Sequence, residues 1–348
     1  MSERIASFTI IAAAAALVGC SESGPTGSAD TQTANASGWQ HPRTAWGDPD
    51  LQGMWPIINL ISTPFQRPVD QQGNPIYGDR EELTDEEYAA TQQRLQARDD
   101  RYQEEIKSNK MGMGHWAETT TRTEAARLTS LISYPADGQL PALTARGEDL
   151  APTFHSDDTQ TVFDSVNDFD AWDRCITRGL PASMLPFNYN NGIRIQQAPG
   201  YVVIDLEMIH EARVVPLGFP PLDPAIKQWM GESRGHWEGA TLVVETTNFT
   251  GKAPMLIAGI PGGVRGPRPS TVNMKTTERF TRVSNDRIDY EMTIEDPEIQ
   301  ADKWTISYPM FLDPKYEFFE YACHEDNTAV RNFIATSQFE RGLRPAAR

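Results

Sequence analysis

Hydrophobic and polar residues alternate along much of the second half of the chain, and this pattern predicts β-strands. Between 288 and 294 every second residue is Ile, Tyr, Met or Ile, and charged or hydroxyl residues stand between them. The stretch 303–310 alternates in the same way, with Trp304, Ile306, Tyr308 and Met310 as its apolar positions. A period of two places each set on one face of a strand. We therefore expect strands with one buried face and one solvent-facing side.

Short strands separated by Gly, Pro, Asn and Asp continue from about Gly192 to the end of this region. Ser284-Asn285-Asp286 predicts a hairpin turn between strands at 276–283 and 287–296. The stretch 229–249 is interpreted as a turn, GESRG, that leads into a strand, TLVVETTNF. Strands that follow one another in this way lose their exposed edges by closing into a barrel. The predicted fold is mainly β, an antiparallel calycin- or lipocalin-like barrel with a hollow apolar interior.

The first half of the domain is predicted to contain a helix and an extended segment. Thr84-Asp85-Glu86-Glu87 is a capping box that predicts a helix reaching about Lys110, whose sparse apolar positions leave most of its surface exposed. We interpret residues 81–152 as a helical insertion and the Trp- and Pro-containing stretch from residue 41 as an extended N-terminal wrap. Residues 41–348 are thus expected to form a single β-rich domain.

The N-terminus carries a targeting pattern. An apolar run from Ile5 follows a polar head, and Leu17-Val18-Gly19-Cys20 fits a lipobox. We expect residues 1–19 to be a lipoprotein signal peptide, Cys20 to be lipidated and residues 20–40 to be a flexible linker. An ordinary cleaved signal is the alternative. Both place the protein in the periplasm, and the Ser after Cys20 favours the outer membrane, with the lipid as the only membrane contact.

The formal net charge of −17 argues against nucleic acid as a partner, because the acidic surface repels phosphates. Two further cysteines, Cys175 and Cys323, either form a disulfide in the oxidising periplasm or remain separate buried thiols. No phosphate-cradling glycine motif occurs, and the six histidines show neither HxH nor HExxH spacing. We therefore expect neither a cofactor nor a metal.

Candidate reactive groups are polar residues predicted on apolar strand faces, which need a partner or a ligand. His210 lies on such a face if 201–210 is one strand; a histidine satisfied in the core is the alternative. His324 lies in a second candidate stretch, Glu320 to Glu325, read as strand positions. The catalytic candidates are His210, His324 and Tyr189. The substrate-binding candidates are Arg213, Arg234, Glu278 and Trp237.

Two of these candidates have open alternatives. Glu278 shares a strand face with Phe280 and Arg282, so that face either lies outside or brings charges into the cavity. Arg234 either stacks on a tryptophan and binds a carboxylate or braces its own turn. Gly231 to Gly235 also fits GxSxG with Ser233 at its centre, but a nucleophile elbow follows a strand and begins a helix, which is the reverse of the order expected here.

Seven motifs in this order resemble a large family of secreted bacterial proteins. They are DPDLQGMW (48–55), TPFQRP (63–68), WDRCITRGLP (172–181), EMIHEAR (207–213), WMGESRGHWEGATLVVETTNF (229–249), ERFTR (278–282) and EYACHEDN (320–327). The motifs span nearly the whole mature chain. The family is similar to the cofactor-independent lyases, decarboxylases or formaldehyde lyases, of lignin-derived phenylcoumaran breakdown. The resemblance transfers no catalytic residue position by position.

A base that takes a proton beside a group that steadies the resulting anion is the minimum for elimination or isomerisation. Together with these candidate groups, the family resemblance implies a periplasmic, cofactor-independent carbon–carbon lyase acting on a lignin-derived or similar aromatic small molecule, and this is the expected function. A lipocalin-like lipoprotein that binds such compounds without changing them is the alternative, and an acidic structural lipoprotein is a third class. The sequence does not specify the substrate, the reaction type or the oligomeric state.

Overall fold

A computed structural model of the chain divides it into two units, Met1–Trp39 and Gln40–Arg348, and the second unit carries the fold. The lipidation site Cys20, the signal peptide and most of the linker lie outside the described residues. The residues that the structure describes are 39–118, 125–154, 161–256, 268–325 and 327–343.

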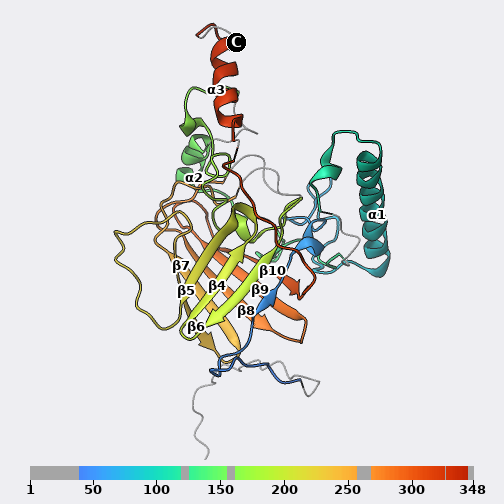
Figure 1. The fold of residues 1–348 in the computed structure, drawn as a ribbon, viewed down its shortest axis with the longest axis vertical. Coiled ribbons are helices and arrows are strands. Elements are labelled where there is room, and N and C mark those ends of the chain that lie inside the picture. Colours follow the sequence, from blue (N-terminus) through green and yellow to red (C-terminus); the bar gives the residue numbers. More distant parts are fainter. Residues whose placement is uncertain (1–38, 119–124, 155–160, 257–267, 326, 344–348) are drawn as a thin grey trace, which may run out of the picture. The chain divides into compact units, whose positions relative to one another are not determined.

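Two antiparallel sheets form the body of this unit (Figure 1). The first has the order β1-β3-β4-β5 and the second the order β2-β10-β9-β8-β7-β6. The strands are β1 (Gly53–Met54), β2 (Ile132–Tyr134), β3 (Ile193–Ala198), β4 (Tyr201–Leu206), β5 (Glu211–Pro216), β6 (Glu232–Glu238), β7 (Thr241–Thr247), β8 (Lys275–Arg282), β9 (Arg287–Glu295) and β10 (Trp304–Phe311). The prediction of a mainly β, antiparallel fold is confirmed.

The alternation that predicted β9 and β10 matches their burial. Ile288, Tyr290, Met292 and Ile294 are all buried, and Tyr290 stands opposite Tyr308 in the register of the two strands. The predicted hairpin between 276–283 and 287–296 is also confirmed, since β8 pairs with β9 and Val283 N donates to Arg287 O (3.0 Å). Local periodicity was sufficient for these strands because each has one wet and one buried face.

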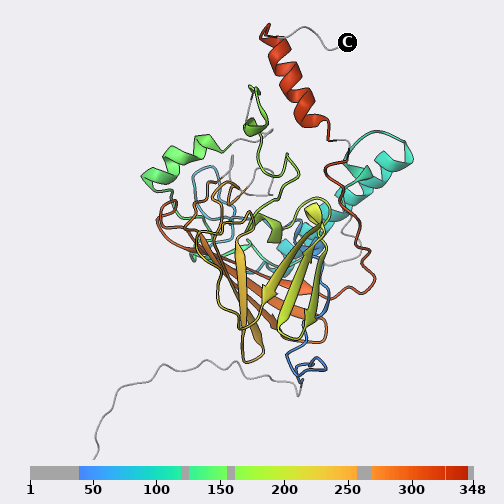
Figure 2. The same cartoon turned by 60° about the vertical axis from the view of Figure 1, so that its left-hand side comes forward.

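The predicted closed barrel is not found in the described residues. The sheets lie face to face (Figure 2), and β5 meets β6 through a single parallel bridge, Leu217 to Gly235. Large side chains from both sheets, among them Phe280, Tyr290 and Trp304, fill the space between them. The expectation of a hollow apolar interior is therefore wrong for the described residues, because the facing side chains pack into a continuous hydrophobic core.

The described residues contain three helices, two before β3 and one after β10. They are α1 (Asp85–Lys107), α2 (Ala145–Leu150) and α3 (Ala329–Glu340), with short 3₁₀ turns at Ile58–Leu60, Met113–His115, Ala151–Thr153, Val166–Asp168, Ala182–Met184 and Met208–His210. The capping box before α1 is present, with Thr84 and Glu87 bonded reciprocally as predicted. Strand β2 lies within the predicted helical insertion and pairs with β10, a pairing that a three-residue segment does not reveal by its pattern.

Three local predictions are wrong. GESRG is mostly strand, since β6 begins at Glu232 and its hairpin turn follows Glu238. Strand β4 ends at Leu206, and Met208–His210 forms a 3₁₀ turn in which Ile209 (φ 63°) and His210 (φ 45°) are left-handed. The stretch 320–325 is turn and irregular structure. The β6 segment pairs with β7, and His210 contacts Tyr321 O from a distant segment, so pairing and tertiary contacts override the local expectation at these two places.

Candidate functional site

Arg213 and Glu278, both predicted to bind substrate, form a buried ion pair between the two sheets. Arg213 on β5 donates from Nη1 to Glu278 Oε1 on β8 (3.0 Å) and from Nη2 to Oε2. Tyr290 also donates to Glu278 Oε1 (2.9 Å). Burial acts to lower the pKa of Arg213, but the charge and hydrogen bonds of Glu278 outweigh it and raise that pKa. The face shared by Glu278 and Phe280 is thus the inner one, and its charges satisfy each other.

A second charged cluster, which we call the Arg178 cluster, lies where the WDRCITRGLP motif and the loop after it meet the start of β5. We define it by Arg178, Glu211, Trp172, Phe187 and Tyr189. The Arg178 guanidinium carbon lies 5.2 Å from the Trp172 ring centroid and 5.3 Å from that of Phe187. The Tyr189 ring packs edge-on against Phe187, 5.0 Å between centroids. Neither Arg178 nor Glu211 was a candidate from the sequence.

Arg178 is a buried cation to which no anion among the described residues is bonded. Its residue is 2% exposed. Its one hydrogen bond among the described residues is a long one from Nη1 to Leu185 O (3.4 Å), and its Nε and Nη2 have no partner. Burial lowers the pKa of Arg178 to about 10, so the group still carries its charge at neutral pH. A buried charge in this state is costly unless an anion or a water arrives to bond it.

Glu211 lies within electrostatic reach of Arg178 and titrates near neutrality. Burial raises the pKa of Glu211 to about 7, although the Thr177 hydroxyl, which donates to Oε2 (2.8 Å), and the charges of Arg213, Arg178 and His210 pull it down. A carboxyl with such a pKa exchanges protons readily at the pH where an enzyme works. The alternation of Glu211, Arg213 and Val215 along β5 was the signal that could have identified it, once β5 is known to begin at Glu211.

His210 immediately precedes Glu211 and is held by a distant backbone carbonyl. Its Nδ1 lies 2.6 Å from Tyr321 O. A carbonyl only accepts hydrogen bonds, so the neutral ring carries its hydrogen on Nδ1 and leaves Nε2 as the acceptor. The ring of His324 lies 6.1 Å away, centroid to centroid. The left-handed φ of Ile209 is unusual for a β-branched residue and marks this turn as a strained one.

A disulfide between Cys175 and Cys323 joins the two segments that supply these groups. One cysteine lies three residues before Arg178, and the other stands between Tyr321 and His324. Of the two possibilities that the sequence left open, the structure therefore shows the bonded one. The bond ties the segment that orients His210 to the loop that carries Arg178.

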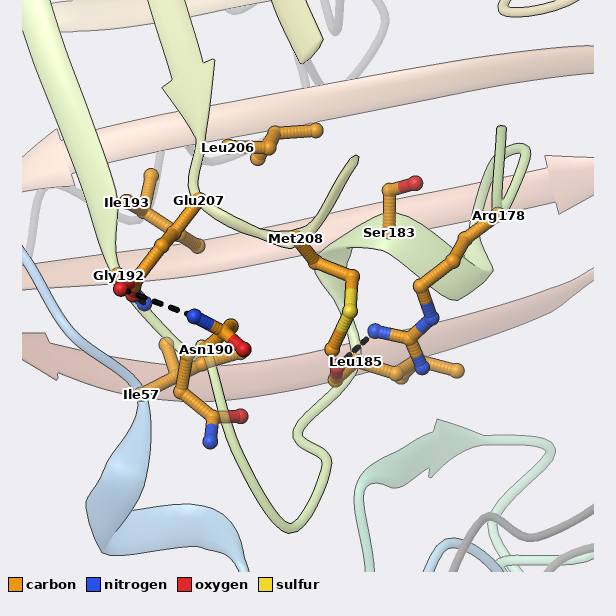
Figure 3. A pocket seen from close by; sticks show the side chains of 11 residues that line it. Ile57, Arg178, Ser183, Leu185, Asn190, Gly192, Ile193, Leu206, Glu207 and Met208 are labelled. Atoms are coloured by element: carbon orange, nitrogen blue, oxygen red, sulfur yellow. Dashed lines mark hydrogen bonds between the residues drawn. The ribbon is translucent and has the colours of Figure 1, made fainter. Parts of the chain in front are cut away.

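The Arg178 cluster continues inward to a small polar cavity (Figure 3). Arg178 and Ser183 line one side of it, and Asn190 and Glu207 line the other. Its volume open to the centre of a water molecule is about 10 Å³, room for roughly one water. Ser183 Oγ also lacks a hydrogen-bond partner in the described residues. Arg178 and Ser183 both line this cavity, and both have hydrogen-bonding atoms without a partner there.

Glu207 at the far side of the cavity is 0% exposed and fully bonded. It accepts from Gly192 N (3.0 Å), Asn190 Nδ2 (3.1 Å) and the Tyr316 hydroxyl (2.5 Å). The same hydroxyl lies 2.8 Å from Glu118 Oε1, and burial raises the pKa of Glu118. These hydrogen bonds attach Asn190 and Gly192 to Glu207, so Glu207 fixes the loop that carries Tyr189.

The remaining candidates lie on β6, away from the hydrogen bonds of the Arg178 cluster. Arg234 donates from Nε to Pro220 O (2.9 Å) and pairs with Glu232. Trp237 packs against the hydrophobic core, and its buried Nε1 has no hydrogen-bond partner in the described residues. Ser233 of the GxSxG match lies inside β6 and bonds the Thr246 hydroxyl (2.9 Å). The structure thus gathers Tyr189, His210 and His324 around one region. Arg213 is paired with Glu278 between the sheets but lies within electrostatic reach of Glu211. Arg234 and Trp237 lie on β6.

Comparison with models of known protein families, with curated proteins and with solved structures found no match. No helix among the described residues combines the length and the apolar character needed to cross a membrane. Within the same residues, no group of three or more His, Cys, Asp or Glu side chains is arranged to hold a metal ion.

Proposed function

We propose that the protein is a carbon–carbon lyase that acts without a cofactor on an anionic aromatic small molecule, with the Arg178 cluster as its active site. One observation carries the proposal: a ring-flanked, buried guanidinium with two unpartnered nitrogens lies in electrostatic reach of a carboxyl whose pKa is about 7. Such a pair couples anion recognition to proton transfer. The family resemblance of the motifs points in the same direction.

Arg178 is the group proposed to hold a carboxylate or phenolate of the substrate. Its planar fork suits a two-oxygen anion, and an incoming anion would relieve the cost of its burial. Because the cavity has room for roughly one water, only the anionic oxygens of the substrate are proposed to enter it, and the substrate ring is proposed to pack outside it against Trp172, Phe187 or Tyr189. A substrate that is both aromatic and anionic therefore matches the two unusual features of the cluster at once.

Glu211 is proposed as the main proton-transfer group, with His210 Nε2 and the more distant His324 as further acid–base candidates. In formaldehyde elimination the base removes the proton of a hydroxymethyl hydroxyl, and the C–C bond breaks to release formaldehyde. The electron pair then forms a C=C bond as a phenoxide oxygen leaves and is protonated. In decarboxylation the C–C bond to the carboxylate breaks and the remaining carbon takes the proton. Both steps balance without an external oxidant or reductant.

Turnover of a defined panel tests the proposal. The purified protein is incubated with lignin-type dimers that carry a hydroxymethyl or carboxylate group, with and without chelator, and the molecular masses of the products are measured by mass spectrometry. We expect loss of the mass of formaldehyde or carbon dioxide in the wild type, and at least a ~100-fold slower reaction for Glu211→Gln. Glu245→Gln is the matched control, because it removes an exposed carboxylate on β7 that is paired with Lys275 on β8. Binding of the dimers with no mass change would support the carrier alternative instead.

The location is part of the proposal. We infer a periplasmic lipoprotein anchored to the outer membrane through Cys20, supported by the lipobox and the signal-peptide order of the first residues. Labelled fatty acid should be incorporated by the wild type and not by Cys20→Ala. Equal labelling of both would remove the anchor from the proposal.

The calycin-like relationship is proposed on topology. Strands β3 to β5 and β6 to β10 follow one another in chain order within their sheets, and the Leu217–Gly235 bridge joins the two runs. Apart from this bridge, which is parallel, the strand order is that of an up-and-down barrel opened along one side. An experimental structure without the hydrogen bond from Gly218 N, just after β5, to Gly235 O on β6 would argue against it.

A further inference from the structure

A groove next to α1 forms a separate cavity, with none of the Arg178 cluster in its lining. Its volume is about 480 Å³, which is within the size range of small-molecule sites. One wall is a face of α1 that carries Thr91, Arg94, Leu95 and Arg98. The opposite wall comes from residues 62–83 and from Ala126 and Leu128.

The groove exists because α1 buries few of its side chains. Of its 23 residues, four are buried: Thr91, Leu95, Asp99 and Tyr102. The helix is instead fastened at its edges, where Leu83 N donates to Arg127 O (2.7 Å) and the Arg127 guanidinium lies 4.2 Å from the Tyr88 ring centroid.

The described lining residues are mostly apolar and include two cations and no acid. Pro64, Pro68, Leu83, Leu95 and Leu128 are among its apolar members, and Ile76 at its edge is 57% exposed.

The two arginines differ in their partners. Arg98 is paired with Asp99 (3.0 Å). Arg94 is exposed, and its hydrogen bond within the described residues goes to the Thr91 hydroxyl (2.8 Å), with no carboxylate beside it. In a chain with a net charge of −17, a groove without acids and with one uncompensated arginine is complementary to an anion.

We propose that this groove binds a small amphipathic anion, with its apolar body between α1 and residues 62–83 and its charged head on Arg94. The volume fits one small molecule, and the single free cation fits one anionic head. This site is independent of the proposed lyase activity, because none of its lining residues belongs to the Arg178 cluster.

Two dyes with the same ring system test the charge directly. Anilinonaphthalenesulfonate carries a sulfonate, and phenylnaphthylamine has the same rings without it; both fluoresce when they leave water. Arg94→Gln should weaken binding of the sulfonate dye by about tenfold and leave the neutral dye unchanged, because one charge-assisted contact is lost. Ile76→Asp should weaken both dyes. Arg101→Gln, on the same helix but outside the groove, should change neither.

The same titrations separate this site from the proposed active site. Arg178→Met should keep the groove-bound fraction of the sulfonate dye. If the dye is lost with Arg178→Met and retained with Arg94→Gln, it binds at the Arg178 cluster and the groove proposal fails. Absence of binding by the wild type overturns it as well, and would indicate that another part of the chain fills the groove. Both variants of the groove alter exposed side chains, so each is expected to fold.

Discussion

Replacing Glu211 with Gln should stabilise the protein at alkaline pH and have little effect in acid. Burial raises the pKa of this carboxyl from its ordinary 4.5 to about 7. The difference corresponds to about 3 kcal/mol of unfolding free energy between the two protonation states. This is an upper value, since the residue is only partly buried. Gln keeps an oxygen that can accept from the Thr177 hydroxyl and never has to be charged.

The sign of this pH dependence follows from the number of protons that the folded and unfolded states bind. Between pH 4.5 and about 7 the folded wild type holds more protons than the unfolded chain, because its carboxyl has the higher pKa. Stability therefore falls as pH rises through this window. Below the unfolded pKa the carboxyl is protonated in both states and carries no penalty. Above the folded pKa the full cost of a buried carboxylate is present.

Urea unfolding of the wild type and of Glu211→Gln, with the disulfide intact, measures this effect. The difference in unfolding free energy should be near zero at the acid end and grow to about 3 kcal/mol at the alkaline end, most of it between pH 4.5 and about 7. Glu245→Gln serves as the control, since its carboxylate is exposed. A difference that does not change with pH would refute the reasoning, because Glu211 would then titrate at its ordinary pKa.

Three further outcomes are expected. Arg178→Met should weaken binding of an anionic aromatic compound by at least about tenfold in ligand titrations, while urea unfolding shows equal or higher stability, because an uncompensated buried cation is removed; lower stability would show that Arg178 has a partner. Glu278→Gln should lower the unfolding free energy by about 3–5 kcal/mol, since Arg213 is left unpaired in the core; wild-type stability would contradict the ion pair. Replacing Cys175 and Cys323 together by Ser should cost about 2–5 kcal/mol in thermal unfolding, because the bond closes a loop with a separation of 148 residues. The same double variant should lose activity per folded molecule if the bond positions His210; unchanged activity would exclude that role.

The sequence alone determined the features that depend on neighbouring residues. Alternation along β9 and β10 sets which side chains face the core, and Thr84 with Glu87 sets the start of α1. The hairpin at 284–286 followed from the same kind of local preference. These features can be predicted because the residues that determine them lie within a few sequence positions of each other.

Tertiary structure alone decided the candidate site. Arg178 and Glu211 lie in the WDRCITRGLP and EMIHEAR motifs, but no local pattern shows that Arg178 is buried or that the two residues come near each other. Their pKa values follow from burial by distant segments. His210 was predicted on a strand, but contacts with Tyr321 and the end of β4 at Leu206 placed it on a strained turn instead. Burial and the meeting of charges depend on contacts between distant positions, whereas alternation and capping depend on neighbours, which is why the strands could be predicted and the site could not.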